Sequence, residues 1–262
     1  MMKNYLLAAL AGVIVSSVQA APQKFSAGKV FKDCPVCPTM VVVPAGTYKM
    51  GGNQLYEQPL HSVTIAKPFA VGKFEVTTDE FKAFVSETGS ANIYFADPNV
   101  TAQGKYPAVN ISWYDAQSYV IWLSKKTGKS YRLLSESEWE YAARAGTASE
   151  FYFPDADISK FANIYGEQDG YSKTAPVGSF APNKFGLHDM SGNVWEWPQD
   201  CWNYGYTDSP ADGSALLTGD CDRRVLRGGS WRSAPAGARS AIRINPPPIG
   251  GDDIGLRVAR TL

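Results

Sequence analysis

The stretch 185–197, FGLHDMSGNVWEW, constrains this chain more than any other part of it. Gly192 and Asn193 favour turn and left-handed conformations, and polar and apolar residues do not alternate, so neither a regular helix nor a plain strand is expected. Asp189 and Glu196 place one carboxylate near each end. A tight loop of this kind can direct backbone carbonyls and two carboxylates to one point, which suits calcium. The alternative is a surface turn that contains two acids.

The composition indicates a globular, loop-rich protein. Of the 262 residues, 44% are hydrophobic, which is enough for a substantial core and argues against global disorder. The 25 acidic and 25 basic side chains balance, so bulk electrostatics gives no reason to expect a nucleic-acid partner. Aromatic residues make up 13%, and glycine and proline are abundant, which favours irregular structure around a core of rings.

Residues 1–20 have the pattern of a secretory signal peptide. Lys3 precedes an apolar run from Tyr5 to Val15, and Val18-Gln19-Ala20 offers a cleavage site. We therefore expect a periplasmic or secreted protein that begins near Ala21 and is not attached to a membrane after cleavage. An uncleaved membrane anchor is the alternative.

All four cysteines lie beyond this segment, and an even number in an exported chain indicates disulfides. Cys201 and Cys221 bracket a polar loop, whose closure would contribute about 3 kcal/mol on the chain-entropy model. Cys34 and Cys37 form a CxxC motif, for which a small structural disulfide or a redox pair is possible. The structural disulfide is favoured, because the strand and long helix of a thioredoxin-like site are missing.

The first half of the chain has most of the regular periodicity. Strands are expected within 40–50 and over 61–71, and helices over 79–87, 113–127 and from Ser135 to Arg144. After Thr147 the pattern predicts turns, with strands only near 223–226 and 255–259. These elements predict one compact α+β domain over 40–262, preceded by a lead-in over 21–39 that holds the CxxC motif.

Several ordered motifs resemble the formylglycine-generating enzyme, or sulfatase-modifying factor, family. They are MVVVPAGTYKMGG, YPAVNISWYDAQSYVIWLS, YRLLSESEWEYAARAG, FGLHDMSGNVWEW, RVLRGGSW and GLRVAR, which together span Met40 to Arg260. The resemblance implies a variant of the C-type-lectin-like fold, low in regular secondary structure, with two bound calcium ions.

The same resemblance implies two sets of calcium ligands. The first consists of the side chains of Asp189 and Glu196 with the carbonyls of Gly192 and Val194, and the second of the side chains of Asn163 and Asp169 with the carbonyls of Ile164 and Tyr171. Both sets contain only oxygen donors, as calcium prefers.

The catalytic residues of the family are where this chain departs from its relatives. The copper-binding enzymes carry two cysteines after the GGS motif, whereas this chain has Ser233 at the first position and no cysteine over 234–238. A serine hydroxyl is a poor ligand for Cu(I), so copper bound through cysteines is not expected. Another branch of the superfamily holds iron with three histidines. This chain cannot build that site, because it contains only His61 and His188. Ser230 has no identifiable histidine base.

A pocket is still implied by the resemblance. Its residues would be Trp195, Ser230, Trp231, Arg232, Ser233, Arg239 and Arg243, with Asp252 or Asp253 near them. Tryptophan faces and guanidinium groups suit an aromatic or carboxylate-bearing peptide ligand, and structural ion pairs are the alternative role of the arginines.

The sequence thus predicts an exported tailoring or maturation factor, an oxidoreductase acting on a secreted peptide or small aromatic substrate. A siderophore chromophore is one example, because a periplasmic branch of the superfamily is linked to its oxidation. Two alternatives remain: a non-catalytic, calcium-containing lectin-like binding module, or an accessory factor of a periplasmic redox enzyme. The redox cofactor, the catalytic base and the oligomeric state do not follow from the sequence.

Overall fold

The computed structural model describes residues 25–90, 103–154 and 157–262. The expected signal peptide lies outside the described residues. Within them, no helix is both long enough and apolar enough to cross a membrane.

The largest element is an antiparallel five-stranded sheet. Its strands, in spatial order, are β1 (Val30–Phe31), β2 (Met40–Val43), β5 (Phe69–Gly72), β13 (Val258–Thr261) and β6 (Tyr131–Leu133). β2 and β5 are buried along their whole length, which explains their continuous apolar sequence. β13 pairs with β5 on one side and β6 on the other, so a late segment of the chain lies inside the sheet. β1 comes from the expected lead-in, whose described part is therefore joined to the domain.

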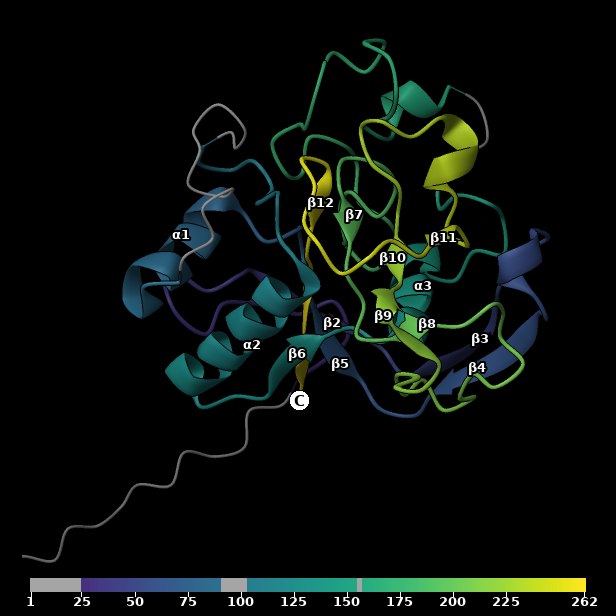
Figure 1. Ribbon diagram of the computed structural model, residues 1–262, viewed down its shortest axis with the longest axis horizontal. Coiled ribbons are helices and arrows are strands. Elements are labelled where there is room, and N and C mark those ends of the chain that lie inside the picture. Colours follow the sequence, from purple (N-terminus) through teal and green to yellow (C-terminus); the bar gives the residue numbers. More distant parts are fainter. Residues whose placement is uncertain (1–24, 91–102, 155–156) are drawn as a thin grey trace, which may run out of the picture.

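A two-stranded ribbon, β3 (Gly46–Met50) with β4 (His61–Ile65), lies on the side of the molecule away from the first two helices (Figure 1). The short helix η1 (Leu55–Glu57) is in the connection between its strands. The single strand expected over 61–71 is thus wrong, because β4 and β5 belong to different sheets. Pro68 lies in the break, where it cannot donate a ladder hydrogen bond.

The three helices begin at the predicted caps. They are α1 (Thr78–Thr88), α2 (Trp113–Thr127) and α3 (Glu136–Arg144), and each has a complete capping box, at Thr77, Ser112 and Ser135 respectively. Gly89 and Gly128 end the first two in the left-handed conformation, as predicted. α3 ends one residue before the predicted Gly146, at Ala145.

The second half is mostly irregular, with very short strands. A four-stranded sheet has the order β11 (Arg243–Ile244), β10 (Leu226–Arg227), β7 (Trp195–Glu196) and β12 (Ile254–Gly255), and β8 (Cys201–Trp202) pairs with β9 (Asp220–Arg224). Two single-turn helices, η2 (Ile158–Lys160) and η3 (Pro235–Ala238), complete the elements. The strand expected over 255–259 is divided between β12 and β13.

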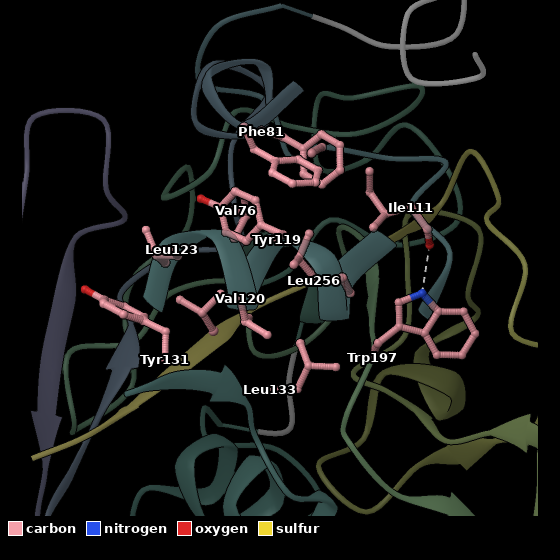
Figure 2. Packing of buried hydrophobic residues seen from close by; sticks show 14 of the residues in the cluster. Val76, Phe81, Ile111, Tyr119, Val120, Leu123, Tyr131, Leu133, Trp197 and Leu256 are labelled. Atoms are coloured by element: carbon pink, nitrogen blue, oxygen red, sulfur yellow. Dashed lines mark hydrogen bonds between the residues drawn. The ribbon is translucent and has the colours of Figure 1, made fainter. Parts of the chain in front are cut away.

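The main core lies between α1, α2 and the five-stranded sheet (Figure 2). Tyr119 and Leu123 of α2 are fully buried, and Phe81 of α1 stacks on the Tyr119 ring at 5.5 Å. Trp197 joins this core to the irregular half, because its indole nitrogen donates to the Ile111 carbonyl at 2.8 Å. The aromatic core predicted from composition is confirmed.

Both predicted disulfides are formed. Cys34 is bonded to Cys37, and Cys201 to Cys221. The second bond holds the loop between β8 and β9, where regular hydrogen bonding is limited to short strands with an irregular register.

Candidate functional site

The loop 185–197 is fixed by left-handed backbone at four positions, of which Gly186 is the first, with φ of 83°. Asp189, Gly192 and Asn193 have φ values of 58°, 77° and 62°. Gly192 is required for a second reason, because a Cβ there would lie 2.1 Å from the carbonyl oxygen of Asn163. The Asn193 amide nitrogen also donates to that carbonyl, at 2.8 Å. The loop therefore packs directly against the segment 163–171, which contains the second predicted calcium site.

Glu196 is bound by an arginine and a tryptophan. Its two oxygens accept hydrogen bonds from the guanidinium of Arg257, the shortest at 2.7 Å, and Oε2 also accepts one from the Trp139 indole at 2.6 Å. Glu196 and Arg257 are almost fully buried. Glu196 is thus the counterion of Arg257, and within the described residues no three His, Cys, Asp or Glu side chains gather in a metal-binding arrangement. The pairing of Asp189 with Glu196 around one cation stays a prediction, and Glu196 already has Arg257 as its counterion.

Asp189 instead faces Glu75, a residue that sequence reasoning missed. The amide of Gly178 donates to Oδ2 of Asp189 at 2.6 Å, and the carboxyls of Asp189 and Glu75 are close enough to affect each other's pKa. Both residues are at least 97% buried by surface area. Burial raises the pKa of Asp189 to about 6, and burial and the charge of Asp189 raise the pKa of Glu75 well above its ordinary value.

This carboxyl pair fits a cation better than the predicted pair does. Glu75 Oε1 accepts a hydrogen bond from Asn193 at 3.0 Å, whereas the buried Oε2 has no donor. Two adjacent buried carboxylates repel each other, so a shared proton or a bound cation would stabilise the pair beyond what the nearby Arg257 charge supplies. Carboxylate oxygens with nearby backbone carbonyls suit calcium. Calcium in this loop stays a prediction, and Glu75 is an added candidate ligand.

The second predicted calcium set stays a prediction, although parts of it lie close together. Asp169 accepts hydrogen bonds from the amides of Ile164 and Tyr171, both at 2.9 Å, so the chain turns closely around its carboxylate. Asn163 donates through Nδ2 to Asn193 Oδ1 at 3.0 Å, and this leaves its own Oδ1 buried without a partner. The unpartnered amide oxygen of Asn163 is a fitting donor for a hard cation.

Part of the predicted pocket forms one cluster. The buried Ser230 hydroxyl donates to Asp253 Oδ2 at 2.8 Å, and its backbone amide donates to the Ser233 hydroxyl at 3.0 Å. The Trp195 amide donates to the Asp253 carbonyl at 2.8 Å, which brings β7 to the same place. Asp253, named from the sequence only as a neighbour, is thus the partner of Ser230.

An exposed ion pair borders this cluster. Arg232 bonds Asp252 at 2.5 Å, and its guanidinium lies 4.5 Å from the ring centre of Trp231. The Arg232 side chain is 53% exposed, so it remains open to an arriving ligand. We name Trp195, Ser230, Trp231, Arg232, Ser233, Asp252 and Asp253 the serine–aspartate cluster.

Arg239 and Arg243 do not belong to this cluster. Arg239 makes a bidentate ion pair with Glu57, at 2.7 and 3.1 Å, and Arg243 makes one with Glu136, with both bonds at 2.7 Å. They line a separate cavity of about 380 Å³, together with Gln54, Tyr56, Glu57, Ala236, Gly237 and Ile242. Their charges are already paired, so the structural alternative for these two arginines is correct.

Position 233 supplies no thiol. Ser233 replaces the first of the two cysteines of the copper-binding enzymes, and its hydroxyl accepts a hydrogen bond within the turn that η3 follows. Every cysteine of the chain is already in a disulfide.

Comparisons with known proteins agree with this arrangement. A model of the sulfatase-modifying factor enzyme 1-like domain matches residues 26–262. The formylglycine-generating enzyme of Thermomonospora curvata is 31% identical, over 73% of this chain and 82% of the relative. The bovine protein named inactive C-alpha-formylglycine-generating enzyme 2 is 28% identical, over 84% of this chain and 87% of its own length.

A solved structure shows a higher identity along nearly the whole chain. The structure of PvdO from Pseudomonas aeruginosa is 45% identical, with a TM-score of 0.86, and the match covers 91% of this chain and all of that one. The predicted α+β, C-type-lectin-like fold with little regular secondary structure is confirmed. This chain belongs to the formylglycine-generating enzyme, or FGE-sulfatase, family.

Proposed function

We propose that this protein is an exported maturation factor that oxidises an aromatic group of a secreted peptide, such as the catechol of a siderophore chromophore. The observation that carries this proposal is the likeness to PvdO, which extends over all of that protein. The absence of a thiol at Ser233 supports it, because formylglycine chemistry through a pair of copper-binding cysteines has no ligands here. The proposal includes export to the periplasm or beyond, as the sequence of residues 1–20 predicts.

The serine–aspartate cluster offers the groups that such a reaction requires. Oxidation of a catechol to a quinone removes two protons and two electrons, and dioxygen that accepts both becomes hydrogen peroxide. Asp253 is the candidate base, and Ser230 can pass a hydroxyl proton to it through their 2.8 Å hydrogen bond. Arg232 offers a positive charge to the catecholate, and the Trp231 ring beside it offers a flat apolar face.

The test is oxygen uptake by the purified mature protein on peptides that carry a catechol, with and without added copper or iron. We expect oxygen consumption matched by hydrogen peroxide, and loss of at least tenfold in rate for Asp253→Asn. Arg223→Gln is the matched control for Arg232→Gln, because Arg223 is also about half exposed and paired with an aspartate. If neither oxygen uptake nor quinone absorbance rises above the rate without protein, the catalytic proposal is wrong.

A binding module is the second candidate, and one observation favours it. Ser230 and Ser233 bond to each other in the place of the copper-binding centre, which leaves a folded site without its thiols. Capture of the same peptides without turnover, unchanged when dioxygen is removed, would support this candidate against the first.

A further inference from the structure

We propose that the Cys34–Cys37 disulfide is a thiol-exchange site that oxidises a dithiol segment of an exported polypeptide. This activity is separate from the serine–aspartate cluster and rests on the function proposed above only for export. The motif is held in the disulfide form, within a turn in which the Cys37 amide donates to the Cys34 carbonyl at 3.1 Å.

The two sulfurs of the bond differ in access. Cys34 is partly exposed, whereas Cys37 has no exposed surface and lies in the main core. The intervening Pro35 and Val36 are both exposed. A thiolate from another molecule can therefore approach Cys34. Cys37 is shielded, so its sulfur becomes the leaving group. Exchange through a single sulfur requires this difference in access.

A cavity of about 390 Å³ adjoins this turn. It is lined by Lys32, Pro35, Val36, Thr39, Phe74, Thr77, Asp79, Glu80, Lys105 and Val177. Two lysines and two acids balance its charge, and Phe74, Val36 and Val177 give it apolar walls. This combination suits an uncharged peptide segment next to the reacting cysteine, rather than an isolated anion.

The charges close to Cys34 favour an arriving thiolate. The Lys32 ammonium donates to the Pro35 carbonyl at 3.3 Å, which keeps a positive charge inside the turn. Asp33, the adjacent acid, is neutralised by Arg260 at 3.1 Å and accepts a hydrogen bond from Tyr131 at 2.6 Å. A neighbouring cation stabilises a thiolate, so exchange at Cys34 is not opposed by the acid next to it.

The fold tolerates opening of this bond better than opening of the other. The Cys34–Cys37 bond spans a sequence separation of 3, against 20 for Cys201–Cys221, and the stabilisation from a disulfide grows with the loop it closes. The surroundings of Cys37 are also held by β1 and β2 on one side and by the main core on the other.

The reaction balances without a further reagent. A thiolate of the partner attacks Cys34 Sγ, a mixed disulfide forms, and the Cys37 sulfur leaves and takes up a proton. The second thiol of the partner then attacks the mixed disulfide and releases Cys34. Two electrons and two protons pass from the partner, which gains a disulfide, to the CxxC motif, which becomes a dithiol.

The experiment uses the folded mature protein in glutathione buffers of stepped redox ratio, with thiol alkylation and peptide mapping. We expect Cys34–Cys37 to be reduced at a reduced-to-oxidised glutathione ratio at least tenfold lower than Cys201–Cys221, while circular dichroism stays native. A synthetic peptide whose single cysteine is supplied as a disulfide with 5-thio-2-nitrobenzoate should form a mixed disulfide with Cys34 in the Cys37→Ser variant, with release of the thionitrobenzoate anion. Reduction of both pairs together, only as the fold is lost, would overturn the proposal.

Two variants separate exchange from a purely structural bond. Val36→Glu should slow adduct formation severalfold with an acidic thiol peptide, because it places a like charge at the cavity, and should leave the thermal midpoint unchanged. The double variant with serine at positions 34 and 37 should keep its fold and lose adduct formation. If Cys37→Ser is folded yet forms no adduct at Cys34, the site is not an exchange site.

Discussion

Arg257 compensates several charges and carbonyls that would otherwise be buried without partners. Its guanidinium binds both oxygens of Glu196 and donates to the carbonyls of Gly72 and His188. It thereby connects β5, the loop 185–197 and the segment that leads into β13. A buried ion pair of this type adds little net stability, but losing one partner is costly.

Replacement of Arg257 by methionine should therefore destabilise the protein by about 3–5 kcal/mol, because Glu196 becomes an uncompensated buried carboxylate. Urea unfolding followed by tryptophan fluorescence measures the change. Arg223→Met is the control, since the exposed Arg223–Asp220 pair, at 3.8 Å, should contribute only about 0–1 kcal/mol. Equal losses for the two variants would contradict this assignment.

Calcium binding at Glu75 and Asp189, as predicted for this loop, should depend on pH. Protons and calcium compete for the same oxygens, and the pKa of Asp189 is raised to about 6 by burial. Calcium affinity should thus be full above this pH and should fall as pH drops from 7 to 5. Calorimetric titrations at both pH values check the direction.

Glu75→Gln should lower this affinity, and saturating calcium should raise the stability of the parent protein by about 2.7 kcal/mol at one hundred times Kd. Glu87→Gln is the control, because Glu87 lies on the surface and bonds Lys126 and Trp122. An unchanged affinity for Glu75→Gln would remove Glu75 from the ligand set.

At the scale of elements, the loop 185–197 depends on the close approach at Gly192. Gly192→Ala would place a methyl group against the Asn163 carbonyl and would also strain a backbone with φ of 77°. We expect the loss to exceed 2 kcal/mol, which is more than the usual cost of a surface substitution. Thermal unfolding of Gly192→Ala and Gly128→Ala separates the steric clash from the backbone strain. Gly128 has the same left-handed backbone but open space around its Cα, so its variant shows the cost of strain alone.

The elements that sequence reasoning predicted well are those with local signals. Thr77, Ser112 and Ser135 cap helices through their own neighbouring residues, so their sequence patterns were sufficient. The division of 61–71 between two sheets was missed because alternation does not reveal which strands pair. Glu75 was missed because only the fold brings the segment after β5, which contains Glu75, next to the loop 185–197.

At the scale of the whole molecule, one buried acid makes stability depend on pH. Asp200 accepts hydrogen bonds from the amides of Glu136 and Leu216, both at 2.8 Å, and so joins α3 to the loop after β8. Burial, with the nearby charge of Glu136, raises its pKa to about 7 in the folded protein. The folded state then binds the proton of Asp200 more tightly than the unfolded state does. The free energy of unfolding that this proton contributes is fully present below pH 4 and is lost as pH rises through 7.

Asp200→Asn removes this titration. The difference in unfolding free energy between the variant and the parent should shift in favour of the variant as pH rises from 4 to 8. Urea unfolding of both proteins across this range measures it, and Asp212→Asn, an exposed site, should give a constant difference. A constant difference for Asp200→Asn as well would show that Asp200 does not titrate in this range.

The fold class could be predicted because many ordered motifs extend along the chain, whereas the reaction could not, because it depends on partners distant in sequence. Ser230 and Asp253 become a pair, and Arg239 and Arg243 are removed from the pocket, only through contacts with other elements. An arginine in a sequence does not show whether its charge is already neutralised by a buried acid.

The central place of β13 has a consequence for the timing of folding. β13 separates β5 from β6, although both precede it by a long stretch of chain. During synthesis, the largest sheet therefore has a gap between β5 and β6 until β13 has been made. Chains that stop before β13 should remain accessible to protease at β2, β5 and β6, and chains that include it should become resistant in one step. Synthesis of β13, rather than growth of an early nucleus, would then set the moment at which this sheet forms.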